Sequence, residues 1–183
     1  MTFTKIYRTP NGFDDMVMTS DGEVLTGLRF INPQNQSKHT MDREEKELPV
    51  FCSTKEWLDI YFTGRQPDFM PAYRIDHLTT FRKEVSDIMQ FIPFGHTMTY
   101  GEIAALIAQK RGIKRMSAQA VGGAVGWNSI CIIIPCHRVL GAGRSLTGYG
   151  GGIKNKIALL KLEGILDFKI HKTFAVSSNN NGG

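Results

Sequence analysis

The first part of the chain alternates hydrophobic and polar positions in short runs, a pattern typical of β-strands. The runs cover residues 3–7, 16–19 and 24–30. Asp21 and Gly22 separate the last two runs, and such turn residues predict a hairpin. Further on, Ser53 with Glu56 three positions later resembles a capping box. It predicts a short amphipathic helix that ends at Gly64.

From residue 79 onward the hydrophobic positions recur with a helical period. A first helix is predicted from Thr79, with its apolar face formed by Phe81, Val85, Ile88 and Met89. Thr99 and Glu102 form another capping-box pattern, and the helix that follows has an apolar stripe of Ile103, Leu106 and Ile107. After a basic turn at 110–114, a third helix is predicted over 116–125. Two helices joined by such a turn suggest a helix-turn-helix, although simple packing gives the same pattern.

The third helix is rich in small residues and lacks the Arg, Lys and Asn side chains that read base edges. Small residues allow a close approach to a sugar-phosphate groove, with sequence-tolerant binding. They equally allow close helix packing through Ala118, Gly122 and Gly123. The pattern leaves both interpretations open.

Residues 130–134 are all hydrophobic and predict a buried strand that ends at Pro135. Cys136 and His137 follow directly. A thiol is a strong nucleophile only as the thiolate, which a nearby imidazole or cation favours. The alternative is that Cys136 is a small buried hydrophobic residue and that His137 is a satisfied surface residue.

Charge is distributed unevenly along the 183 residues, whose net charge is +5. Residues 1–76 hold 9 Lys and Arg against 12 Asp and Glu, whereas residues 77–183 hold 13 against 5. This asymmetry predicts two domains, 1–76 and a basic, polyanion-facing 77–170, followed by a polar tail at 171–183 that is expected to be disordered. A solvated basic surface is the alternative.

Three cysteines without CxxC spacing indicate reduced thiols, not a disulfide framework. The longest apolar run is too short to span a bilayer, and the N-terminus lacks the pattern of a secretory signal. We therefore expect a cytoplasmic protein without a membrane partner.

The run from Ile134 to Val139, Ile-Pro-Cys-His-Arg-Val, resembles the acceptor motif of the O6-alkylguanine-DNA alkyltransferases. The resemblance extends in order over the second half of the chain, through 91–93, 99–103, 120–124, Asn128, 148–151 and 159–164. It implies an α/β (α+β) fold: a small N-terminal α/β domain with a β-sheet, and a mainly helical C-terminal domain whose winged-helix-like helix-turn-helix lies in the DNA minor groove.

The resemblance also implies the function. The expected reaction is DNA repair by irreversible, single-turnover transfer of an alkyl group from O6-alkylguanine, and also from O4-alkylthymine, to Cys136 after base flipping. The expected partner is alkylated double-stranded DNA, bound by a monomer without sequence preference, and no cofactor is needed. Some members hold zinc in the first domain, but only Cys52, His39 and His77 are present here, so no metal is predicted.

By the same resemblance, Glu163, His137 and a water form a relay to Cys136. Tyr100 is expected to crowd the phosphate beside the lesion and to share a proton with the departing guanine, and Asn128 to tie the recognition helix to the acceptor loop. Residues expected to contact DNA or the flipped base are Ser117, Ala118, Gln119, Ala120, Gly122, Arg138, Val139, Tyr149 and Gly150. Gln119 stands where many members carry an arginine, so flipping or DNA affinity is expected to differ.

Two other functions remain open at this stage. A regulatory protein that binds the lesion without repairing it is favoured only by Gln119 and the basic second half. A thiol hydrolase using Cys136 and His137 ranks last, because no oxyanion site is recognisable.

Overall fold

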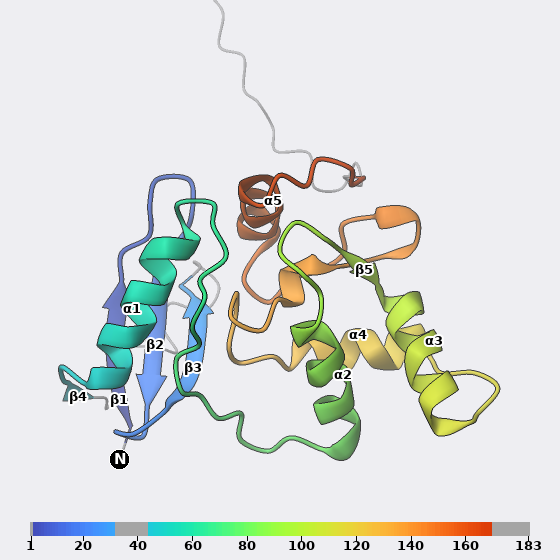
Figure 1. Ribbon diagram of the computed structural model, residues 1–183, viewed down its shortest axis with the longest axis horizontal. Coiled ribbons are helices and arrows are strands. Elements are labelled where there is room, and N and C mark those ends of the chain that lie inside the picture. Colours follow the sequence, from blue (N-terminus) through green and yellow to red (C-terminus); the bar gives the residue numbers. More distant parts are fainter. Residues whose placement is uncertain (1, 32–43, 170–183) are drawn as a thin grey trace, which may run out of the picture.

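The computed structural model describes residues 2–31 and 44–169, and the tail at 171–183 lies outside them. Figure 1 shows a small sheet with its covering helix on one side of the molecule and a group of helices on the other. This is the predicted mixed α/β fold. The predicted boundary after residue 76 stays a prediction, and one continuous hydrophobic core links the two parts. Within the described ranges, no helix is long and apolar enough to cross a membrane.

The N-terminal sheet has four strands in the order β3-β2-β1-β4. Their bounds are Phe3–Tyr7 for β1, Met16–Ser20 for β2, Leu25–Phe30 for β3 and Glu44–Glu45 for β4. The first three strands pair antiparallel, so the predicted hairpin is present, while β4 pairs in parallel with β1. Alternation in the sequence therefore located the three longer strands well.

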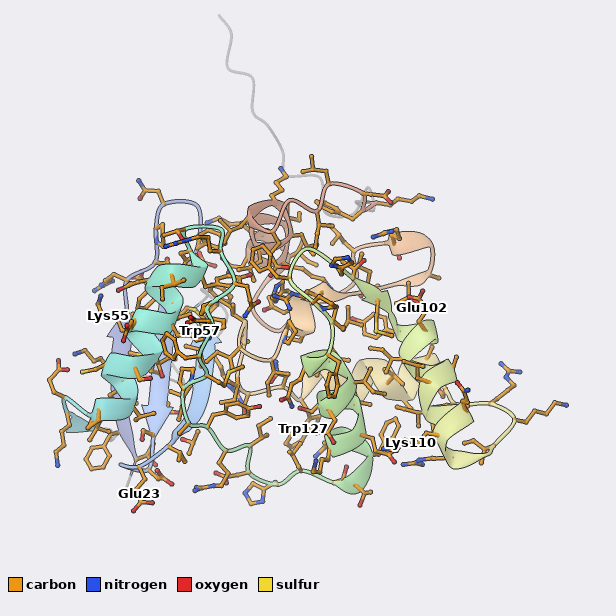
Figure 2. The ribbon with its side chains drawn as sticks, viewed as in Figure 1. Glu23, Lys55, Trp57, Glu102, Lys110 and Trp127 are labelled. Carbon is orange, nitrogen blue, oxygen red and sulfur yellow. The ribbon has the colours of Figure 1, made fainter. Side chains whose placement is uncertain are left out.

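One helix, α1 (Pro49–Tyr61), lies across the sheet (Figure 1). The predicted start at a Ser53 and Glu56 capping box is wrong, because both residues lie inside the helix. The helix begins instead with Pro49, which suits a first turn because the missing N–H has no helical partner there. Trp57 lies on the buried side of α1 and Lys55 on its exposed side (Figure 2).

Up to residue 169, where the described residues end, the C-terminal part contains four α-helices: α2 (Thr80–Gln90), α3 (Tyr100–Arg111), α4 (Ala118–Gly126) and α5 (Ile153–Leu162). Helices α3 and α4 pack together as the predicted helix-turn-helix. The capping box of Thr99 and Glu102 is present. Ile103 and Ile107 are buried as predicted, but Leu106 is 44% exposed, so the buried face of α3 is narrower than its apolar stripe.

Two very short strands connect the helix-turn-helix to the acceptor motif. β5 (Met98–Thr99) immediately precedes α3, and it pairs in parallel with β6 (Val139–Leu140). β6 follows a 3-10 helix, η2 (Cys136–Arg138), and leads to a second one, η3 (Ala142–Arg144). This pairing fixes the start of α3 relative to η2.

The predicted strand over 130–134 is wrong, although the segment is buried as expected. The chain turns back on itself there, and Ile132 has φ 69°, which is costly for a β-branched residue. The segment pairs with β3: Leu28 N donates to Ser129 O, and Cys131 N donates to Leu28 O, both at 2.8 Å. The sheet therefore positions the chain that leads to the acceptor motif.

Candidate active site

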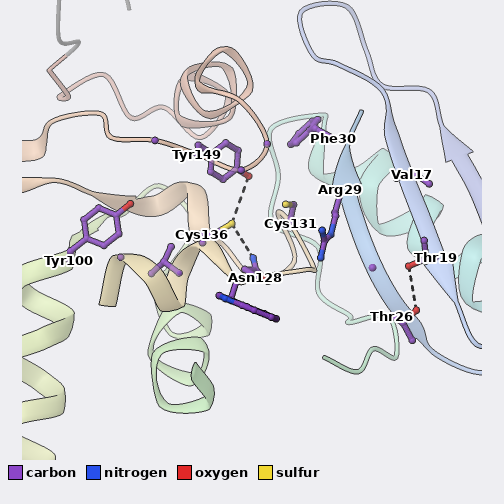
Figure 3. Close-up of a pocket in the computed structure, with 18 residues that line it drawn as sticks. Val17, Thr19, Thr26, Arg29, Phe30, Tyr100, Asn128, Cys131, Cys136 and Tyr149 are labelled. Carbon is purple, nitrogen blue, oxygen red and sulfur yellow. Dashed lines mark hydrogen bonds between the residues drawn. The ribbon is translucent and has the colours of Figure 1, made fainter. Parts of the chain in front are cut away.

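A cavity of about 650 Å³ lies between β3, the end of α4 and the loop after η3 (Figure 3). Cys136 lines it and is only 4% exposed. The other predicted site residues in its lining are Tyr100, Gly122, Asn128, Tyr149 and Gly150. The structure therefore gathers six predicted residues, distant in sequence, around one buried thiol.

Asn128, which lies just after α4, forms hydrogen bonds to the segment 130–136 that contains Cys136. Its Nδ2 donates to Cys136 Sγ at 3.0 Å and to Ile134 O at 2.9 Å, while its Oδ1 accepts from Ile130 N at 3.0 Å. One amide side chain thus holds both ends of the turn and the thiol. This geometry supports the predicted link between the recognition helix and the acceptor loop.

The surroundings of Cys136 favour its thiolate. A hydrogen bond from the Cys131 thiol is the largest effect and, although burial raises the pKa, this bond together with Asn128, Tyr149 and the charge of Lys156 lowers it to about 7. Tyr149 Oη lies 3.8 Å from Cys136 Sγ. The pKa of Cys131 is raised well above its usual value, first by its hydrogen bond to Cys136, so Cys131 stays a thiol. A substantial thiolate fraction of Cys136 is therefore present near neutral pH.

Behind the thiol, His137 Nε2 lies 2.7 Å from Glu163 Oε1, and both side chains are fully buried. Burial raises the pKa of Glu163, but hydrogen bonds from His137 and Arg138 outweigh it and hold the pKa at about 2. The ionised carboxylate can only accept, so Nε2 carries the imidazole proton. Nδ1 is then a bare acceptor, buried and without a hydrogen bond to any described residue. Burial also lowers the pKa of His137, which keeps the ring neutral.

Arg138 does not face the cavity. It is 5% exposed, its Nε donates to Glu163 Oε2 at 2.9 Å, and its Nη1 donates to Ile92 O at 2.6 Å. The prediction that Arg138 contacts DNA disagrees with this placement, because its guanidinium is used inside the protein. Val139 is likewise fully buried and is not among the cavity-lining residues, in contrast to its predicted role at the base.

Tyr100, the first residue of α3, lines the main cavity and an adjoining hollow of about 480 Å³. Thr147 Oγ1 donates to its phenol oxygen at 3.1 Å, and burial raises its pKa, so the phenol stays protonated near neutral pH. Ala118 and Gln119 line the hollow as well. Tyr100 therefore stands between the thiol cavity and the start of α4.

The outer face of α4 carries small side chains and is exposed. Its predicted contact residues, Ser117, Ala118, Gln119 and Ala120, are all exposed. A Cβ added at Gly123 would meet nothing within 4 Å, and at Gly122 it would meet only the Tyr100 ring at 3.8 Å. Close helix packing through Ala118 and Gly123 is therefore not what these small residues provide.

Three contributors to the site were missed. Tyr61 donates to Glu163 Oε1 at 2.6 Å from α1, and the fully buried Lys156 donates to Val139 O at 2.6 Å. Arg29 lines the cavity from β3. Tyr61 and Lys156 occur within ordinary helical patterns, and Arg29 within an ordinary strand, so no local signal distinguishes them. In the part of the chain that the structure describes, no group of His, Cys, Asp and Glu side chains could hold a metal ion.

Comparison with known proteins identifies the family. Residues 80–165 match the family model "6-O-methylguanine DNA methyltransferase, DNA binding domain". A protein of Haemophilus influenzae named methylated-DNA–protein-cysteine methyltransferase is 38% identical over 167 residues, which cover 88% of each chain.

Solved structures that resemble this protein belong to the same family. The Mycobacterium tuberculosis O6-methylguanine methyltransferase superposes with a TM-score of 0.72 at 36% identity, covering 89% of this chain and 93% of that one. A structure of the M. tuberculosis protein in complex with DNA gives a TM-score of 0.69 at 36% identity, covering 88% and 92%. The chain therefore belongs to the methylated-DNA–protein-cysteine methyltransferase family of DNA-binding repair enzymes.

Proposed function

We propose that this protein removes the alkyl group from O6-alkylguanine in duplex DNA, and from O4-alkylthymine, by transferring it to Cys136. The observation that carries the proposal is the buried, acidic thiol in the wall of a cavity next to the open face of α4. A cavity of about 650 Å³ has the size of a small-molecule site and can hold a single base.

Access to the thiol requires base flipping. Cys136 is 4% exposed, so a base stacked inside the duplex cannot bring its O6 substituent to Sγ. Extrusion of the nucleotide solves this problem, and it costs less at a damaged base pair. The exposed small residues of α4 let the helix backbone approach a narrow minor groove, and the basic second half supplies phosphate contacts that do not depend on sequence.

The proposed chemistry is a single displacement. The imidazole of His137, oriented by Glu163, takes the thiol proton through a water at Nδ1. The Sγ thiolate then forms a bond to the alkyl carbon while the bond from that carbon to O6 breaks. The guanine leaves with the electron pair and is reprotonated through the phenol of Tyr100, which recovers its proton from the relay.

The product is a thioether at Cys136, which has no simple route back to a thiol. Each molecule therefore reacts once, without a cofactor, as a monomer. The reaction needs reduced thiols, and Cys52, Cys131 and Cys136 are all free. This requirement is met in a cytoplasmic setting.

The decisive experiment is the intact mass of the protein after incubation with a duplex that carries one O6-methylguanine, followed by peptide mapping. A gain of one methyl group per molecule on Cys136 is expected. Cys52→Ala, which alters an exposed thiol on α1, should react normally, and Cys136→Ala should gain nothing. Retained lesion binding with unchanged protein mass would overturn the proposal in favour of a lesion-binding protein.

A further inference from the structure

The sheet side of the cavity carries a charge that the methyl-transfer reaction does not use. Arg29 on β3 is exposed and is the only Lys or Arg among the described residues that line the cavity, and no described Asp or Glu lines it. Arg29 forms no ion pair or side-chain hydrogen bond with a described residue, and its charge acts on the neighbouring Cys131 thiol. A guanidinium at the wall of a cavity that no described carboxylate neutralises is suited to binding the carboxylate of a ligand.

Backbone pairing places Arg29 next to Cys131, the neighbour of the reacting thiol. Leu28 forms a parallel bridge with Ile130. Arg29 and Cys131, which follow these two residues, therefore lie opposite each other on the two paired segments. Side chains alternate along an extended strand, and these two point into the same cavity (Figure 3). Cys131 in turn hydrogen-bonds Cys136. The cavity wall therefore runs from the acceptor sulfur through Cys131 to the guanidinium of Arg29.

The geometry of the displacement directs the alkyl group toward this wall. Sulfur, the transferred carbon and O6 lie roughly in line during the step, so any further atoms on that carbon extend sideways. Tyr100 and Gly122 form the side of the cavity at α3 and α4, the side from which the proposed docking of α4 in the groove brings in the guanine. Atoms beyond the transferred carbon have room on the opposite side, along β3, where Thr19, Thr26 and Arg29 contribute polar groups.

We infer that the cavity accepts O6-alkyl groups that end in an anion, with O6-carboxymethylguanine as the type substrate and Arg29 as the residue that pairs with its carboxylate. The inference rests on the proposed transfer to Cys136. In this reaction Sγ forms a bond to the methylene carbon and the bond from that carbon to O6 breaks. The guanine leaves with the electron pair and gains the proton that the thiol lost, and Cys136 becomes S-carboxymethylcysteine.

A different role for Arg29, contact with a DNA phosphate, makes another prediction. Loss of a phosphate contact weakens binding of every lesion to the same extent. Loss of a carboxylate partner affects only the anionic substituent. The two roles are therefore separated by comparing substrates, not by the effect of a substitution on one substrate.

The test uses the full-length protein in saturating excess over duplexes that carry O6-methyl-, O6-carboxymethyl- or O6-carbamoylmethylguanine. The carbamoylmethyl group matches the carboxymethyl group in shape but has no charge. Single-turnover transfer rates are measured for the wild type, Arg29→Ala, Arg29→Lys and Arg65→Ala, the last removing an exposed charge outside the cavity. For Arg29→Ala, the rate ratio of carboxymethyl to carbamoylmethyl should fall about tenfold, the size of one charge-assisted hydrogen bond.

Arg29→Lys should keep part of this ratio, and Arg65→Ala should leave it as in the wild type. A ratio that is unchanged in Arg29→Ala, or an equal loss for all three lesions, overturns the inference while leaving the proposed function intact. Failure of the wild type to transfer even the methyl group, with folding confirmed by circular dichroism, overturns the proposed function itself.

Discussion

Tyr61 and Glu163 are joined by a 2.6 Å hydrogen bond, although they come from opposite parts of the molecule. Tyr61 ends α1 beside the sheet, and Glu163 directly follows α5. The same carboxylate accepts from His137 and Arg138. The sheet-containing part thus helps to hold the group that sets the tautomer of His137, and it is more than a support for the DNA-binding part.

Replacing Tyr61 by Phe removes this donor without changing the ring. We expect the free energy of unfolding in urea to fall by roughly 1.5 to 3 kcal/mol, the cost of losing a buried hydrogen bond to a charged group. The transfer rate should fall less than tenfold, because His137 and Arg138 still fix Glu163. Tyr7→Phe is the matched control, since Tyr7 donates to the half-exposed Asp59. A larger loss of stability in Tyr7→Phe would contradict this assignment.

Cys131 provides a second prediction, because its thiol makes the largest contribution to the low pKa of Cys136. In Cys131→Ala this donor is lost, so the pKa of Cys136 should rise and the pH of half-maximal transfer should move up by about one unit. Cys131→Ser keeps a donor and should stay closer to the wild type. Rates of transfer between pH 6 and 9 measure the shift, and equal profiles for Ala and Ser would refute it.

Lys156 is fully buried, and its positive charge also lowers the pKa of Cys136. Burial lowers its own pKa to about 8, so its charge is lost as the pH rises through that value. Lys156→Met should therefore slow transfer at pH 7 by roughly threefold to tenfold, an effect of up to about one pKa unit. The change should shrink at pH 9. Lys154→Met, on the exposed side of α5, should transfer normally at both pH values.

The sequence predicted those parts of the fold that depend on local patterns. Alternation located the longer strands, and side-chain capping located the start of α3, because both signals lie within a few residues of the element. The start of α1 was misplaced because a Ser and a Glu at capping spacing also occur inside helices, and Pro49 was the better signal. The apolar segment 130–134 was misread because burial alone does not distinguish a strand from a tight turn.

The sequence predicted only those site residues that belong to a recognisable motif. Cys136, Asn128 and Tyr149 lie together as the resemblance implies, but Tyr61 and Arg29 reach the site through tertiary packing. Arg138 was misplaced for a related reason. A surface arginine and one paired with a buried carboxylate look the same in sequence, and only the fold brings Glu163 to Arg138.

Acid should destabilise the protein through Glu163 and His137. The pKa of Glu163 is about 2 in the folded protein against 4.5 for an ordinary Glu, so its contribution is complete above pH 4.5 and disappears as the pH falls toward 2. It amounts to roughly 3 kcal/mol. The pKa of His137 is lowered, so the unfolded chain binds a proton below pH 6.5 that the folded protein does not, which also favours unfolding.

Urea unfolding between pH 7 and 3 should therefore give a free energy of unfolding that declines progressively as the pH falls. Glu56→Gln changes an exposed carboxylate on α1 and should leave this decline as it is. A free energy that stays level from pH 7 to 4 would show that the buried pair does not govern acid stability.

Gln119 is exposed at the start of α4 and lines the hollow beside Tyr100, without a charge to offer to DNA. Gln119→Arg adds one cation at this position. We expect tighter binding to duplex DNA and a slope of log affinity against log salt that is steeper by about one. Gln66→Arg adds the same charge on the far, sheet-containing part, where Gln66 is exposed. Because both variants change the net charge equally, an equal gain in affinity would mean that α4 is not the DNA-facing element, whereas a gain confined to Gln119→Arg supports its position in the groove.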